Sequence, residues 1–220
     1  MRPRIGIVDS GINQALQHRV RDARFFGPEA QELAPLEGQL VHGSVLARLI
    51  LEQCPQADLL VAQIFRHSRQ AAVAHVVEAI DWLVDGGAQL INMSFGLQQA
   101  SPVLQQACQR ARQAGVLLLA SVPARGQPTY PAAFAECLAV SGDARCTVDE
   151  ISWLNLAHVD FGGNPMIQPG APEQGGGSSF ACARVAGMAA ALLAEGHPAE
   201  TVDGLLRQKA CHVGPERRLA

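Results

Sequence analysis

GGGSSFACARVAG, residues 175–187, combines three glycines, two serines and the start of an apolar run. The glycines permit a sharp turn, and the composition from Phe180 onward favours a helix. A serine at such a helix start lies beside backbone N–H groups that have no partner within the helix and can bind an oxyanion. Ser178 or Ser179 is therefore a candidate nucleophile. The alternative is a simple N-cap, which serine also favours.

The composition predicts one globular domain. The chain has 220 residues, of which 48% are hydrophobic and 17% are charged. A chain of this length can bury a substantial core. We expect a single domain over residues 1–220, with a flexible tail over residues 210–220.

Charge and cysteine content exclude several classes of partner. The net charge of −3 gives no electrostatic basis for binding nucleic acid or an anionic membrane, and no apolar run is long enough to span a bilayer. Asp9 interrupts the apolar residues that a signal peptide would need. The six cysteines show no metal-type spacing and suit buried free thiols in a reducing compartment. We expect a cytoplasmic protein with no cofactor or metal.

Short apolar runs alternate with amphipathic segments along most of the chain. This alternation predicts βαβ units, and hence a parallel sheet with helices on both faces. The expected strands cover residues 4–8, 57–65, 89–95, 116–120 and 137–140, with a short strand ending near Phe25–Phe26. The expected helices cover residues 42–51, 70–84, 102–114, 179–195 and 198–209. Residues 143–178 are expected to be irregular, with one or two short, antiparallel strands.

Two further polar residues stand at the ends of predicted elements. Asp9 follows the first strand, and functional groups gather at the carboxyl ends of strands in open α/β sheets. It would equally suit an Asx-turn. His42 begins a predicted helix, where the helix dipole favours the neutral imidazole. A lone histidine is more often structural, but with Asp9 and Ser179 it completes a set of acid, base and nucleophile.

Three motifs resemble those of the subtilisin-like serine peptidases, the subtilases. IVDSG (residues 7–11) is similar to the family's aspartate motif, and HGSVLA (residues 42–47) to its histidine motif. Residues 177–187 resemble the serine motif, with Ser179 as the nucleophile and Ser178 in a threonine's place. The order Asp, His, Ser is also that of the family. The resemblance runs from residue 4 to about 195 and implies a three-layer α/β fold with a mostly parallel central sheet.

The resemblance also implies where a peptide or protein substrate binds. Ser94, Phe95 and Gly96 are similar to the strand that pairs with an extended substrate in this family. Ala120 and Ser121 would line the pocket for the residue before the scissile bond. No acidic cluster of the kind that builds a calcium site is present.

One departure from the family concerns the oxyanion hole. Pro123 stands where the family has an asparagine, and proline has no side-chain donor. Loss of this donor lowers kcat about 10²–10³-fold in a subtilisin. Arg125, Gln127 and Ser121 are the nearest candidates to replace it, in that order. A partner protein that completes the site is a further expectation.

The resemblance implies a serine endopeptidase that cleaves a specific peptide or protein through an acyl-enzyme. A leader-peptide peptidase is one example, and capture of the acyl-enzyme by an amine would give a transamidase. The alternative is a weak or inactive pseudo-peptidase that binds peptides or a partner. A nucleotide-binding domain would need a GxGxxG motif after a strand or a P-loop lysine, and the sequence has neither.

Overall fold

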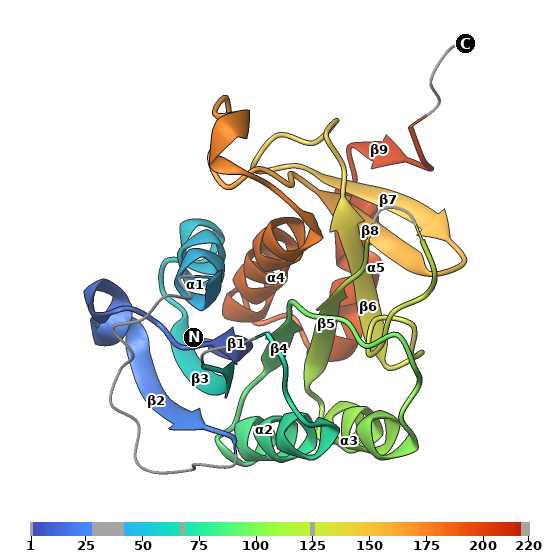
Figure 1. Ribbon diagram of the computed structural model, residues 1–220. Helices are drawn as coiled ribbons and strands as arrows, with labels where there is room; N and C mark the ends of the chain where they lie inside the picture. The colour runs from blue at the N-terminus through green and yellow to red at the C-terminus, as the bar shows by residue number, and fades with distance from the viewer. Residues whose placement is uncertain (1, 28–41, 67–68, 124–125, 217–220) are drawn as a thin grey trace.

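A nine-stranded sheet forms the centre of the computed structural model, which describes residues 2–27, 42–66, 69–123 and 126–216 (Figure 1). The strand order is β2-β3-β1-β4-β5-β6-β8-β7-β9. Neighbouring strands are parallel except for the antiparallel pair β7 and β8. The strands are β1 (Arg4–Ser10), β2 (Val20–Phe25), β3 (Asp58–Phe65), β4 (Leu90–Met93), β5 (Leu117–Ser121), β6 (Cys137–Gly142), β7 (Ile151–Leu156), β8 (Val159–Gly163) and β9 (His212–Val213).

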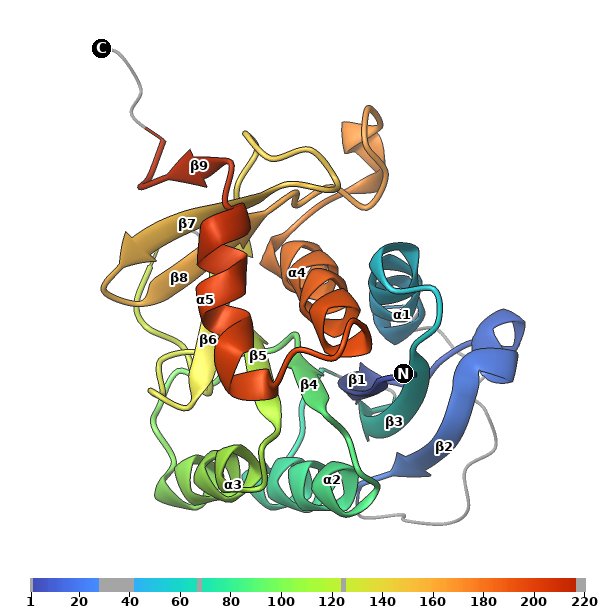
Figure 2. The ribbon, with the colours of Figure 1, turned by 180° about the vertical axis from the view of Figure 1, so that it is seen from behind.

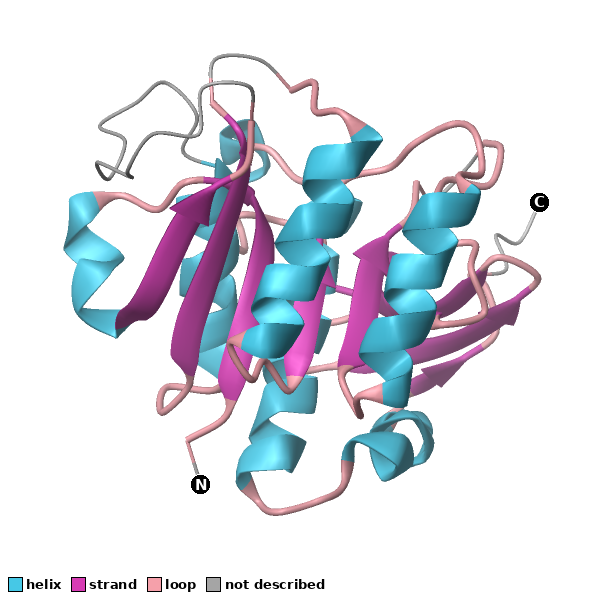
Figure 3. Ribbon diagram, turned by 90° about the horizontal axis from the view of Figure 1, so that it is seen from below, coloured by secondary structure: helices cyan, strands magenta, loops and turns pink. Residues whose placement is uncertain are grey.

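Helices cover both faces of this sheet (Figures 1 and 3). One face carries α2 and α3, and the other carries α1, α4 and α5, so the fold has three layers. Figure 2 shows α5 beside β7 on the second face. The helices are α1 (His42–Gln53), α2 (Val73–Asp85), α3 (Pro102–Gln113), α4 (Ser178–Ala194) and α5 (Ala199–Lys209), with short 3₁₀ turns at Gln14–Arg19 and Pro172–Gln174.

The apolar pattern explains the central position of β1. All of its residues after Arg4 are buried, because helices pack against both faces of the strand. Such strands are continuous apolar runs rather than alternating ones. The hydrophobic core is correspondingly divided by the sheet into two clusters, one around α4 and one around α2 and α3.

The structure confirms the predicted α/β class and the predicted strands, with boundary shifts of a few residues. The antiparallel pair β7 and β8 lies inside the segment that was expected to be irregular with short strands. The helix predicted from residue 70 begins instead at Val73, because Ala72 has an extended backbone conformation.

Residues 210–214 pack on the sheet, where the sequence predicted a flexible tail. β9 pairs with β7 in parallel, and the N–H of Cys211 donates to the carbonyl of Ile151 (2.9 Å). The guanidinium of Arg145 donates to the carbonyl of Gly214 (2.7 Å) and pairs with Asp143 (2.7 Å). The paired residues of β7 and β9 lie about 60 positions apart in the sequence, so no local sequence pattern predicts their pairing. Residues 217–220 lie outside the described part of the chain.

This ion pair predicts a pH-dependent contribution to stability. Burial raises the pKa of Asp143, but the hydrogen bonds and charge of Arg145 outweigh it and lower the pKa from 3.8 to about 2. A depressed pKa stabilises the fold above the ordinary pKa of the group, and this stabilisation is lost as the pH falls through the folded-state value. We expect Asp143→Asn to lower the free energy of unfolding at pH 7. The difference from wild type should shrink between pH 4 and about pH 2, as measured by urea unfolding.

Asp203→Asn provides the control, because it removes an exposed i,i+4 ion pair with Arg207. Exposed pairs of this kind contribute little to stability. A difference between wild type and Asp143→Asn that stays constant over this pH range would contradict the prediction.

Within the described residues, no single helix is long and apolar enough to cross a membrane. Only α4 and α5 taken together meet the length and composition criteria, and the two are bent by 119° at the break between them. The described residues also contain no group of three or more His, Cys, Asp or Glu side chains placed to hold a metal ion.

Candidate active site

The site begins at the carboxyl end of β1, where Asp9 is held by its neighbour Ser10. The register of β1 against β3 shifts between Asp9 and Ser10, and such irregularities redirect side chains. One carboxylate oxygen of Asp9 accepts hydrogen bonds from the Ser10 N–H (2.7 Å) and the Ser10 hydroxyl (3.1 Å). Asp9 is 1% exposed, so these bonds fix a carboxylate that water barely reaches.

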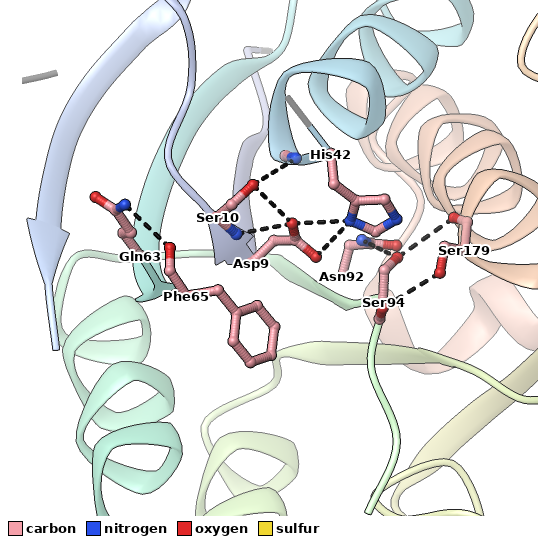
Figure 4. Close-up of polar contacts among 9 residues, drawn as sticks. Asp9, Ser10, His42, Gln63, Phe65, Asn92, Ser94 and Ser179 are labelled. Carbon is pink, nitrogen blue, oxygen red and sulfur yellow. Dashed lines mark hydrogen bonds and ion pairs between the residues drawn. The ribbon is translucent and has the colours of Figure 1, made fainter. Parts of the chain in front are cut away.

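Asp9 in turn orients His42, the first residue of α1 (Figure 4). The Nδ1 of His42 lies 2.9 and 3.0 Å from the two carboxylate oxygens of Asp9. A carboxylate accepts only, so Nδ1 carries the proton and the lone pair of Nε2 is left free to act as a base. The ring of Phe180 lies beside the imidazole, with centroids 5.5 Å apart.

Ser10 also fixes the start of α1. Its hydroxyl accepts a hydrogen bond from the Gly43 N–H (2.9 Å), so one side chain satisfies a free N–H of the helix and contacts Asp9. A glycine is required at position 43, because a Cβ there would lie 2.2 Å from the Ser10 carbonyl oxygen. This role of Ser10 could not be predicted from the sequence, although Ser10 lies between Asp9 and Gly11 in the IVDSG motif.

The structure separates the two candidate serines. The N-cap of α4 is Gly177, and neither serine has the N-cap role that the sequence left open. The Ser178 hydroxyl faces Ser141 of β6, at 3.5 Å, whereas Ser179 lines the same cavity as Asp9 and His42. Ser179 is the second residue of the helix, so its N–H is among those without a partner inside the helix.

Ser179 is linked to the end of β4 by two hydrogen bonds (Figure 4). Its hydroxyl donates to the Ser94 carbonyl (3.2 Å), and the Ser94 hydroxyl donates to the Ser179 carbonyl (3.3 Å). The amide of Asn92, which is fully buried, donates to the Ser94 hydroxyl (3.0 Å). In the described part of the chain, no hydrogen bond joins the Ser179 hydroxyl to His42.

A cavity of about 220 Å³ connects these groups. Its lining residues come from six segments of the chain: Asp9, Ser10, His42, Phe65, Arg69, Ser94, Phe95, Gly96 and Ser179. The predicted substrate residues Ser94, Phe95 and Gly96 are thus beside His42 and Ser179. Phe65 and Arg69 were missed, because nothing in the local sequence links the end of β3 to this site.

Ala120, Ser121 and Gln127 are not among the described residues that line this cavity. Ala120 and Ser121 are buried on β5, so their substrate role stays a prediction. Gln127 is exposed, and Arg125 lies outside the described residues. Pro123 is exposed just after β5. Within the described residues, the Ser179 N–H is therefore the one predicted oxyanion donor that the structure places at the start of α4, beside the candidate nucleophile.

Arg184 supports the turn that precedes Ser179 and was also missed. This arginine of α4 is 1% exposed, and burial lowers its pKa. Its guanidinium donates to three backbone carbonyls, those of Asn164 (3.1 Å), Met166 (2.7 Å) and Ile167 (3.4 Å). The intervening Pro165 carbonyl accepts the N–H of Gly177 (2.9 Å), so the loop held by Arg184 positions the start of α4.

Comparisons with known proteins show the family and the fold of this chain. The model of the Subtilase family matches residues 3–215. Alkaline elastase YaB of Bacillus sp. (strain YaB) is 25% identical over 203 residues, covering 85% of this chain and 53% of the relative. Subtilisin NAT of Bacillus subtilis subsp. natto is 25% identical over 219 residues, covering 90% and 57%. The chain thus spans a little over half of the length of these relatives.

Solved structures share the fold. A cold-adapted subtilisin-like serine proteinase has a TM-score of 0.74 at 20% identity, covering 94% of this chain and 84% of that chain. The self-cleaved protease domain of PatA has a TM-score of 0.67 at 25% identity, covering 94% and 87%. The prenylagaramide maturation protease PagA has a TM-score of 0.65 at 22% identity, covering 92% and 81%. Together with the family match over almost the whole chain, the fold and the motif order show that this chain belongs to the subtilase family.

Proposed function

We propose that this protein is a serine endopeptidase in which Ser179 is the nucleophile, His42 the general base and Asp9 the residue that orients it. The observation that carries the proposal is the short contact of the buried Asp9 carboxylate with His42 Nδ1, in a cavity that Ser179 also lines. This contact holds the tautomer that a base needs and stabilises the imidazolium once it forms.

The proposed reaction follows the acyl-enzyme route. The Ser179 side chain first rotates from the Ser94 carbonyl toward His42, and Nε2 takes its proton as the oxygen attacks a peptide carbonyl. The Ser179 N–H at the start of α4 stabilises the oxyanion. His42 then protonates the leaving amine, and water hydrolyses the acyl-enzyme. An amine in place of that water would give transamidation instead.

Pro123 limits the rate of this chemistry. With no asparagine amide, one oxyanion donor is absent unless the substrate, a partner protein or a residue such as Gln127 or Arg125 supplies it. Such a donor contributes about 10²–10³-fold to kcat. A slow enzyme of this kind suits the processing of one specific peptide better than general digestion.

We propose that the substrate is an extended peptide that pairs with residues 94–96, as in β-strand addition. Cleavage of a leader peptide is the processing role that we favour. The likeness to PatA and to the maturation protease PagA supports it at the level of the family. We also propose a reducing, cytoplasmic location, which is supported by six free cysteines, five of them buried.

The alternative function is a peptide-binding pseudo-peptidase. Two observations favour it: proline at the oxyanion position, and a Ser179 hydroxyl that is bonded to Ser94 rather than to His42. The intact set of Asp9, His42 and Ser179 favours the enzyme, since loss of activity would leave no chemical reason to keep all three.

A fluorophosphonate probe distinguishes the two functions, because only a serine activated by a base reacts with it. We expect covalent labelling of the wild type, detected by intact-protein mass spectrometry, and none of Ser179→Ala. Ser178→Ala is the matched control, since this neighbour faces Ser141 and should leave labelling intact. If the folded wild-type protein takes up no label, the proposed peptidase activity is contradicted.

A further inference from the structure

Among the described residues that line the cavity beside His42, Arg69 supplies the one accessible fixed charge. Asp9 is the other side chain of fixed charge that lines it, but Asp9 is 1% exposed and its carboxylate is occupied by Ser10 and His42. Arg69 is exposed, and no ion pair or hydrogen bond holds its guanidinium within the described residues. The accessible charge that the described residues present to a substrate in this cavity is therefore positive, although the whole chain carries a net charge of −3.

Two aromatic rings line the same cavity as Arg69. Phe65 ends β3 and Phe95 follows β4, and their rings meet edge to face with centroids 6.1 Å apart. Both line the cavity together with Arg69. An apolar wall lowers the local dielectric and so strengthens the attraction of a cation for a carboxylate beyond that of an exposed pair. It also suits the methylene groups of a long acidic side chain.

The position of Phe65 indicates which part of a substrate reaches Arg69. Figure 4 shows Phe65 and Ser179 on opposite sides of Asp9 and His42. An extended peptide advances about 3.3 Å per residue, and alternate side chains face the same way. The recognised side chain is therefore not that of the residue at the cleaved bond. We place it two to four positions before that bond, in the segment that we propose to pair with residues 94–96.

We infer that Arg69 selects substrates with an acidic residue, glutamate above all, two to four positions before the cleaved bond. The carboxylate pairs with the guanidinium, and the methylene groups pack on Phe65 and Phe95. This inference rests on the proposed function for the placement of the peptide. It adds the chemical class of the substrate, which the likeness to known proteases leaves open.

Paired substrates test the inference. A peptide library digested by the wild type and analysed by mass spectrometry first supplies a cleaved sequence. Fluorogenic peptides are then made with glutamate or glutamine at each of the three positions. At one of them we expect kcat/KM to favour glutamate about five- to tenfold, the size of one partly desolvated ion pair. This preference should shrink as the salt concentration rises.

Variants assign the preference to one side chain. Arg69→Gln should reduce the ratio of kcat/KM for glutamate over glutamine to about one. Arg69→Lys should retain part of the preference, and Arg69→Glu should reverse it in favour of glutamine. Arg110→Gln is the control, because Arg110 pairs with Asp81 on the surface of α2 and α3. It should leave the ratio unchanged.

Each outcome decides between the inference and the proposed function. A wild type that cleaves both peptides equally at all three positions, or an Arg69→Gln variant that keeps the preference, overturns the inference and leaves the peptidase intact. Absence of both labelling and cleavage overturns the peptidase. In that case a peptide that binds the protein is selected from the same library and made with glutamate or glutamine at each position. Equal affinities of these peptides, measured by fluorescence anisotropy, overturn the inference as well.

Discussion

Replacing Asp9 by asparagine is expected to lower kcat about 10⁴-fold while KM changes little, the size of effect seen when the orienting carboxylate of such a triad is neutralised. The Ser10 N–H holds an oxygen at the Oδ1 position, at 2.7 Å, so the new amide NH₂ takes the Oδ2 position. That position is 3.0 Å from His42 Nδ1. The amide oxygen at the Oδ1 position also lies 2.9 Å from Nδ1, but it already accepts two hydrogen bonds from Ser10. The new NH₂ therefore donates to Nδ1 and favours the imidazole tautomer that carries its proton on Nε2. In that tautomer Nε2 has no lone pair to accept the proton of Ser179.

Steady-state kinetics on the cleaved peptide measures this effect, and circular dichroism shows whether the variant is folded. Asp143→Asn is a matched control, since it neutralises another buried aspartate that does not line the cavity. It should change stability and leave kcat close to that of the wild type. If Asp9→Asn keeps more than a tenth of the wild-type kcat, Asp9 does not have the proposed role.

Replacing Gly43 by alanine is expected to lower both stability and activity. The new Cβ would lie 2.2 Å from the Ser10 carbonyl oxygen and 2.9 Å from that of Gly11, and both are backbone atoms that cannot rotate away. The start of α1 must therefore move from the end of β1. This shift weakens the hydrogen bond from Gly43 to the Ser10 hydroxyl (2.9 Å) and moves His42 relative to Asp9. We expect a loss of about 2–3 kcal/mol in the free energy of unfolding.

Urea unfolding at constant temperature measures the loss, and Gly204→Ala supplies the control. Gly204 is also a glycine within a helix, α5, but a Cβ there would have no atom within 4 Å. Alanine is about 0.8–1 kcal/mol more favourable than glycine in a helix interior, so this variant should be more stable than the wild type. Equal changes in the two variants would contradict the importance of the Gly43 contact.

The elements and the order of the site residues could be predicted from the sequence, because they depend on local patterns. Buried parallel strands are continuous apolar runs, and helices repeat their apolar residues with a period of 3.6. Asp9, His42 and Ser179 stand in short motifs at strand ends and helix starts. The α/β class and their shared location at one edge of the sheet follow from these patterns.

The partners of these residues were decided by the tertiary structure. Which serine faces the cavity depends on how the start of α4 packs against β4 and β6. In this packing the Ser179 hydroxyl bonds to the Ser94 carbonyl, and the Ser178 hydroxyl faces that of Ser141. The pairing of β9 with β7 likewise joins segments far apart in the sequence. A contact of this kind has no periodicity or motif, because it is set by packing between elements rather than within one.

The stretch at residues 175–187 shows both what local sequence determines and what tertiary packing determines. Its sequence by itself determined a glycine turn, a helix and a serine at the helix start. Only the tertiary structure decided that Arg184 binds the loop at residues 164–167, and that Ser179 lines one cavity together with His42 and Arg69. Local propensity selects the elements, whereas the position of one side chain against another depends on the register and packing of segments that meet only in the folded chain.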